Sequence, residues 1–175
     1  MRLLALIGAL AIIGAIAIGG YLFGGFYSVA ATQPENELVA SALEQIRMAS
    51  IARHGEQRAT VALEDPAVVQ AGARAYAARG CVSCHGAPGI TWAKFSEAMR
   101  PYPPDLKDVV KAREPGELFF VIKNGIKMTG MPGFALIGAD DREIWSIVAF
   151  IRRMPNVSEA DFKAWSESGE AGASQ

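Results

Sequence analysis

The two cysteines of this 175-residue chain lie three positions apart, and a histidine follows the second of them. In the segment Cys81-Val82-Ser83-Cys84-His85, two thiols on one helical turn can form thioethers with both vinyl groups of a haem. His85 is then placed to ligate the iron from the proximal side. The segment therefore predicts one covalently attached haem c, held by Cys81, Cys84 and His85.

Two other uses of these thiols fit the sequence less well. A zinc site needs four ligands, and His54 is the only other histidine in the chain. A redox-active dithiol of the thioredoxin type needs a flanking pattern of strand and helix, which is absent here. That interpretation also leaves His85 without a role.

Residues 66 to 155 resemble the class I c-type cytochromes. The resemblance rests on Cys81 to His85, on Lys127 to Phe134 (KMTGMPGF) and on two terminal helices. It implies an all-α domain of about four to five helices around a single haem. In that family a methionine beside a proline is the sixth iron ligand. Met131 matches this position, 46 residues after His85.

The chemistry of a methionine ligand supports the same assignment. A thioether is soft and neutral, so it favours ferrous iron and raises the reduction potential relative to a second imidazole. Pro132 stiffens the loop, and Gly130 and Gly133 are expected to let it approach the porphyrin. Met128 is the alternative ligand, although it lacks a following proline. Met99 and His54 are weaker alternatives.

Start and stop signals predict the helices around this centre. Asp65 caps a helix with Pro66 at its first position, and the Asp140 to Glu143 spacing suits a capping box. The expected helices cover residues 66–79, 105–113, 115–123 and 140–153, with a loop over 86–104.

The resemblance adds packing and second-sphere roles. It implies that Gly72 and Tyr76 pack against Ile147 and Phe150 where the two terminal helices cross. It also implies that a proline carbonyl in the loop accepts the ring proton of His85. The candidates for these second-sphere roles remain open: Pro88, Pro101, Pro103 or Pro104 for that carbonyl, and Trp92, Arg100 or Trp145 for a haem propionate.

The amino-terminal segment, residues 1–30, predicts a transmembrane anchor. The 25 residues from Leu3 to Tyr27 carry no charge and would span about 37 Å as a helix, more than a hydrocarbon core of about 30 Å. A cleaved signal sequence ending near Val29-Ala30-Ala31 is the alternative, but its apolar core is usually shorter. Arg2 places the amino terminus inside and the rest of the chain in the bacterial periplasm.

The anchor also carries small residues four positions apart, which would let another transmembrane helix approach closely. These residues are Ala11, Ala15 and Gly19, with Gly20 and Gly24 as a second pair. This pattern suggests docking to a membrane complex, although glycine is also common in such helices.

Two further segments flank the expected domain. Residues 31–65 form a connector with an amphipathic helix over 35–54, whose apolar stripe is Leu38, Ala42, Ile46 and Ala49. This helix is open to three interpretations: contact with anionic headgroups through its arginines, packing on the domain or a partner, or simple exposure to solvent. Residues 156–175 are polar and acidic and predict a flexible tail.

Composition excludes a disordered or nucleic-acid-coating chain, since 51% of the residues are apolar and 20% charged. Residues 66–155 carry 12 basic and 8 acidic side chains, a net +4. Lysines at 107, 111, 123 and 127 suggest redox partners with acidic docking surfaces, although scattered solvated lysines explain the charge equally well.

These features predict a membrane-anchored electron carrier of the respiratory type and not an enzyme. The alternatives are a fixed electron-transfer subunit of a larger membrane oxidoreductase and, less favoured, a haem peroxidase or gas sensor. The last class would need a methionine that leaves the iron.

Overall fold

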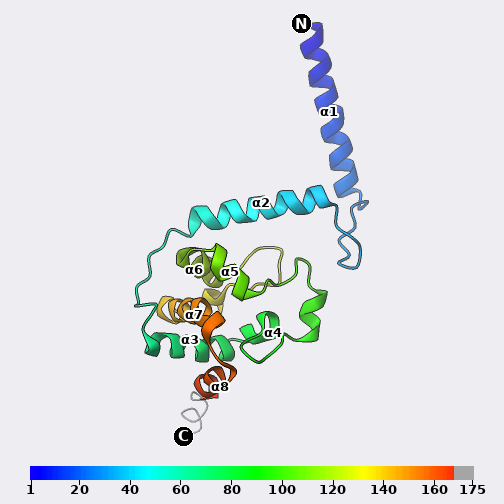
Figure 1. The fold of residues 1–175 in the computed structure, drawn as a ribbon. Helices are drawn as coiled ribbons and strands as arrows, with labels where there is room; N and C mark the ends of the chain where they lie inside the picture. The colour runs from blue at the N-terminus through cyan, green and yellow to red at the C-terminus, as the bar shows by residue number, and fades with distance from the viewer. Residues whose placement is uncertain (168–175) are drawn as a thin grey trace. The chain divides into compact units, whose positions relative to one another are not determined.

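A computed structural model describes residues 1–167, and its elements are helices joined by loops (Figure 1). The expected all-α class is confirmed, because residues 1–167 contain no β-strand. The α-helices are α1 (Arg2–Phe23), α2 (Glu37–His54), α3 (Pro66–Ala78), α4 (Cys81–His85), α5 (Leu106–Ala112), α6 (Pro115–Asn124), α7 (Asp141–Arg153) and α8 (Glu159–Glu167). Short 3₁₀ helices are η1 (Lys94–Ala98), η2 (Phe134–Ile137) and η3 (Met154–Asn156).

Helix α1 belongs to a separate unit, residues 1–36, and the second unit begins at Glu37. It has 22 residues, carries no charge after Arg2 and buries none of its side chains. Its length and composition are sufficient for it to cross a membrane. The structure therefore provides the helix that membrane anchoring requires.

Helices α3 and α7 cross at the centre of the second unit. Asp65 Oδ1 accepts a hydrogen bond from the Ala67 amide, so the expected cap of α3 is present. A Cβ on Gly72 would overlap the carbonyl oxygen of Ser146, which shows that only glycine permits this approach. The packing implied by the resemblance is present in outline, with Ser146 as the nearest neighbour of Gly72.

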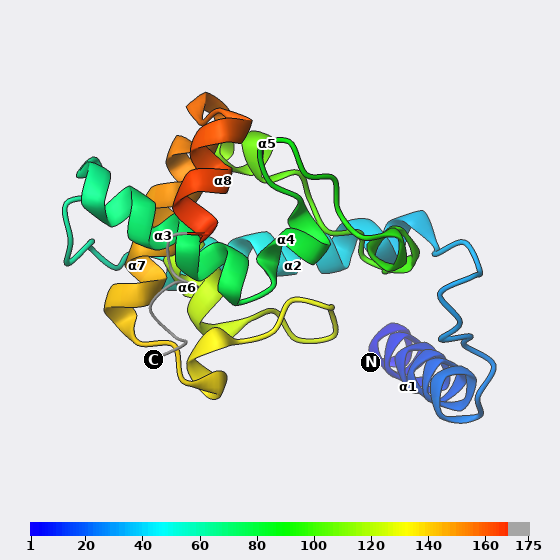
Figure 2. The ribbon, with the colours of Figure 1, turned by 90° about the horizontal axis from the view of Figure 1, so that it is seen from below.

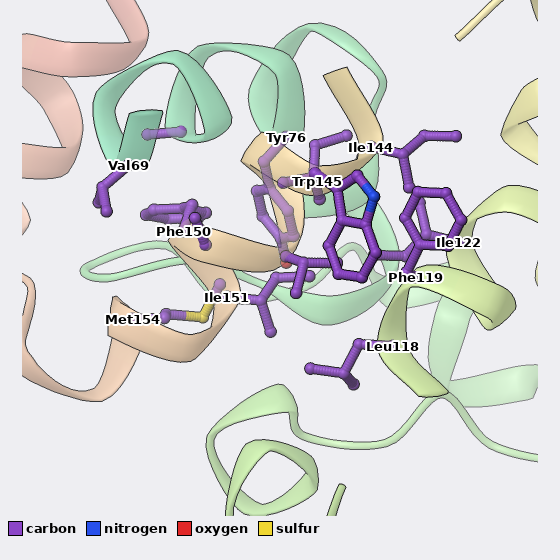
Figure 3. Packing of buried hydrophobic residues seen from close by; sticks show 14 of the residues in the cluster. Val69, Tyr76, Leu118, Phe119, Ile122, Ile144, Trp145, Phe150, Ile151 and Met154 are labelled. Atoms are coloured by element: carbon purple, nitrogen blue, oxygen red, sulfur yellow. The ribbon is translucent and has the colours of Figure 1, made fainter. Parts of the chain in front are cut away.

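The hydrophobic core surrounds this crossing and extends to α6 (Figure 3). Tyr76 and Phe150 are fully buried, and their ring centroids lie 5.2 Å apart. On the other side, Phe119 of α6 stacks on Trp145 of α7 at 4.2 Å. Trp145 is only 2% exposed and packs between α6 and α7.

Helix α2 contacts the domain through a face that the sequence pattern did not single out. Ile51 is its one buried residue, and the side chain of Met48 contacts the Arg113 guanidinium. The ring of His54 stacks on Phe120 of α6 with centroids 5.4 Å apart. The predicted stripe of Leu38, Ala42, Ile46 and Ala49 lies largely in the solvent instead.

The prediction of a flexible tail from residue 156 onward is wrong for residues 159–167. These residues form α8, which packs against α3 (Figure 2). Phe162 is 2% exposed and stacks on Phe150 at 5.5 Å. Trp165 of the same helix is partly buried against the core. The acidic composition of the segment concealed these two aromatic contacts. Residues 168–175 lie outside the described range.

Candidate haem site

The attachment segment forms a short helix of its own directly after α3. Cys81 and Cys84 are free and partly buried, one turn apart on α4. Burial raises the pKa of the Cys81 thiol to about 12. A nucleophilic redox thiol has the opposite property, a lowered pKa, so this environment does not favour a thioredoxin-type dithiol.

The structure selects one proline carbonyl for His85. The Nδ1–H of His85 donates to the carbonyl oxygen of Pro104 at 3.0 Å. Because a carbonyl can only accept, this bond fixes the tautomer and leaves the lone pair of Nε2 free for a metal. Burial lowers the pKa of His85, which keeps the imidazole in the neutral form that ligation needs.

Tyr76 connects the attachment segment to the core. Its hydroxyl donates to the carbonyl oxygen of Gly86 at 2.7 Å, at the residue that ends α4. Burial raises the pKa of Tyr76, so the phenol stays protonated and keeps this donor. The residue expected to serve only as packing therefore also holds the end of the Cys81–His85 turn.

The loop that carries the candidate methionines runs from Gly125 to Gly133, between α6 and η2. Met131 is partly buried and packs against the core, whereas Met128 is 98% exposed. Met128 also has a φ of 59°, in the left-handed region. The two methionines thus occupy different environments, with Met128 at the surface.

Thr129 holds the backbone of this loop. Its hydroxyl donates to the carbonyl oxygen of Ile126 at 2.8 Å and accepts from the amide of Met131 at 3.1 Å. The Ile126 amide donates in turn to the Met131 carbonyl oxygen at 3.2 Å. A threonine two residues before a candidate ligand was the only sequence signal for this arrangement.

A family model described as cytochrome c oxidase, cbb3-type, subunit III matches residues 67–151. The matched range contains both the attachment segment and the methionine loop. The globular domain is a class I c-type cytochrome. No curated protein and no solved structure shows a significant match to the chain. Haem-based electron transfer is the function of such a domain, and the cytochrome has that function here.

Arg79 joins the two halves of the cytochrome's candidate site. Its Nε and Nη2 donate to the carboxylate oxygens of Glu143 at 2.7 and 2.8 Å. Its Nη1 donates to the Ile137 carbonyl oxygen at 3.0 Å, in the η2 segment that follows the methionine loop. The expected capping box at α7 is therefore only half formed: Asp140 accepts from the Glu143 amide, but the Glu143 carboxylate binds Arg79.

Other protein atoms lie very close to the glycines of the loop. The sequence pattern predicts instead that these glycines let the loop approach a porphyrin. A Cβ on Gly130 would lie 2.9 Å from Met99 Sδ, and one on Gly133 would lie 2.7 Å from the Asn124 carbonyl oxygen. A Cβ on Gly125 would overlap the backbone of Met131 to Gly133. The loop is thus pressed against the end of α6, and Met99 packs on it from the opposite side.

The apolar surface near the candidate ligands fits a largely apolar macrocycle. Large apolar side chains are exposed on the two segments that carry or follow His85 and Met131. They are Ile90, Trp92, Phe95 and Tyr102 in the first segment, and Met128, Leu136 and Ile137 in the second. Two partly buried thiols, one oriented imidazole and one half-buried thioether complete a donor set suited to haem c.

The Thr129 hydroxyl provides a test of how the loop holds Met131. Thr129→Val keeps the shape but leaves the Met131 amide without its acceptor, which should lower stability by about 1 kcal/mol. In the oxidised protein, the weak sulfur-to-iron absorption band should then disappear at a lower temperature. Thr129→Ser should retain the wild-type behaviour, and Thr60→Val, at an exposed position, serves as control. A band in Thr129→Val as heat-resistant as in the wild type would contradict this role.

Proposed function

We propose that this cytochrome carries one haem c, bound covalently through Cys81 and Cys84 and ligated axially by His85 and Met131. The observation that carries the proposal is the His85 to Pro104 hydrogen bond, since it directs Nε2 to act as the ligand atom. The partial burial of Met131 favours it over Met128. When bound, the haem iron takes up and releases one electron at a time.

The residues proposed as ligands also explain why electron transfer is favoured over catalysis. With an imidazole and a thioether both in place, no position is open to oxygen or peroxide. Thr129 and the close contact between Gly125 and the loop oppose departure of Met131. A peroxidase or gas sensor would need this loop to open, so that alternative has less support.

We further propose that α1 remains in the bacterial cytoplasmic membrane as a single uncleaved anchor, with the haem domain in the periplasm. The uncharged run of α1 and the position of Arg2 at its amino terminus support this orientation. The protein then works as a membrane-bound carrier that exchanges electrons with redox proteins on the periplasmic side.

A fixed subunit of a membrane oxidoreductase is the second candidate function. The matching family model is described as a subunit of a cytochrome c oxidase. The small residues of α1, from Ala11 to Gly24, would allow close packing with another transmembrane helix. Extraction in mild detergent followed by native mass measurement separates the two: a carrier has the mass of one chain with one haem, and a subunit that of a larger complex.

We keep redox partners with acidic docking surfaces as part of the proposal. The positive surface that would attract them is smaller than the composition implied, because two of the lysines are paired with aspartates. Lys123 is paired with Asp141 at 2.6 Å, and Lys111 with Asp108 at 2.9 Å. The net +4 of residues 66–155 still supports attraction to an acidic partner. Lys127, which lies in the methionine loop, is the lysine best placed to contribute.

Covalent attachment can be tested by changing each thiol. The wild-type polypeptide should keep the mass of one haem after denaturation and stain for haem peroxidase activity on a gel, because thioethers survive unfolding. Cys81→Ala and Cys84→Ala should each abolish or sharply reduce mature haem protein. Ser83→Ala, on the exposed side of the same turn, should not. Haem that acid acetone extracts from the wild type, or a mass of two haems, would refute the proposal.

The methionine assignment can be tested by comparing Met131 with Met128. Met131→Ala should open the iron to carbon monoxide and remove the sulfur-to-iron band of the oxidised protein. Met131→His should keep low-spin iron but lower the potential substantially, since imidazole favours ferric iron more than a thioether does. Met128→Ala should keep the band, because this side chain is exposed. If Met128→Ala removes the band and Met131→Ala spares it, the assignment is wrong.

A further inference from the structure

Helix α2 has two faces with different surroundings. One face, which we call the inner face, packs on the domain through Met48, Ile51 and His54. The opposite face, which we call the outer face, consists of Leu38, Ala42, Ile46, Ala49 and Arg53. Leu38 is 82% exposed and Ile46 is 66% exposed. At about 100° per residue, the two faces lie roughly half a turn apart.

The outer face is apolar from Leu38 to Ala49, over about three turns. In the described part of the chain the domain packs against the inner face, and the aliphatic side chains of the outer face lie exposed. Their spacing of three and four residues is that of an amphipathic helix that binds an apolar surface.

The charges of α2 are divided between the two faces. Glu37, Glu44 and Ile51 follow one another at intervals of seven, which places both acidic residues of α2 on the inner side. Arg53 follows Ile46 by the same interval and lies on the outer face. The outer face therefore has no acidic residue and one arginine, a charge distribution suited to an anionic lipid surface.

The segment that leads to α2 also indicates that the outer face contacts lipid. Only residues 24–36 separate α1 from α2, and they can span at most about 45 Å. No charged residue occurs between Arg2 and Glu35. Phe26 and Tyr27 are aromatic residues of the kind found at membrane interfaces, and Phe26 is 74% exposed. This segment can stay at the membrane surface until shortly before α2 begins.

We infer that α2 is an interfacial helix, whose outer face inserts among the headgroups of the bilayer that α1 enters. Leu38 and Ile46 reach the acyl boundary, and Arg53 meets anionic lipid headgroups. This inference rests on the proposed anchoring by α1. It gives the connector a function: α2 keeps the haem domain beside the membrane.

The test uses the full-length haem protein in nanodiscs that contain zwitterionic and anionic lipid. Leu38→Cys, Ile46→Cys and Glu44→Cys each receive a nitroxide label, with Cys81 and Cys84 already consumed by haem. Glu44 is the matched control, since it is exposed and lies within one turn of Ile46 but on the inner side. The measurement is the ratio of collisions with oxygen, which enters lipid, to collisions with a water-soluble nickel complex.

The labels at positions 38 and 46 should give a ratio severalfold higher than the label at position 44. Equal access of nickel to all three labels would overturn the inference. Labels 38 and 46 that are exposed to nickel in nanodiscs but protected in native membranes would also overturn it and assign the outer face to a protein partner.

Two further readouts separate this inference from the proposed function. The haem absorption spectrum of each variant reports whether the site has formed. Retention on lipid after a high-salt wash reports whether α1 anchors the chain. If the chain washes off, both the proposed anchor and the interfacial helix are contradicted. If the chain is retained with an intact spectrum but its labels are exposed to water, only the interfacial helix is contradicted.

Discussion

Helices α3 and α7 meet backbone to backbone at Gly72, where the carbonyl oxygen of Ser146 occupies the space that any Cβ would need. Such a close approach fixes the distance and the crossing point of the two helices, because neither backbone can move closer or slide past the other. The aromatic pair of Tyr76 and Phe150 then fills the space beside the crossing. The positions of both helix ends follow from this contact, and those ends carry the haem site.

Each end of the crossing controls one part of the site. The carboxyl end of α3 leads directly into the Cys81–His85 turn, which the Tyr76 hydroxyl holds through Gly86. The amino end of α7 carries Glu143, and Arg79 connects it to both α3 and the Ile137 carbonyl oxygen. A shift of α7 would therefore be transmitted to the segment after the methionine loop. Rigid positioning of the two segments proposed to carry the axial ligands would suit electron transfer, since it limits the change of geometry between oxidation states.

The sequence predicted those parts of the structure that depend on local chemistry. Asp65 and Asp140 each cap the helix that the pattern assigned to them, because capping involves only neighbouring amides. Asp105, which was predicted to begin a helix, caps it instead. Contacts between distant segments could not be predicted in this way. Pro104 was one of four candidate carbonyls, and only the folded loop brings it to His85.

The misjudged segments share one physical cause. Composition and periodicity average over many residues, whereas one large side chain can decide where a helix packs. In α8, Phe162 stacks on Phe150 and Trp165 packs beside the core, and these two aromatic residues fix an otherwise acidic segment. In α2, the buried residue is Ile51, which lies outside the regular stripe. The stripe was correctly recognised as apolar, but no local signal in the sequence indicated what it contacts.

The docking of α2 also determines how far the haem domain can travel. If residues 31–65 were all extended, the domain could move about 120 Å from its anchor. Ile51 and His54 instead fix the end of α2 to α6, so α2 moves with the domain. Only residues 24–36 remain as a tether, and their reach is about 45 Å. If α1 stays in the membrane as proposed, a domain with this reach meets partners that are embedded in the same membrane or bound to its surface. The carrier and the fixed subunit therefore differ less than the sequence suggested, because both exchange electrons close to the bilayer.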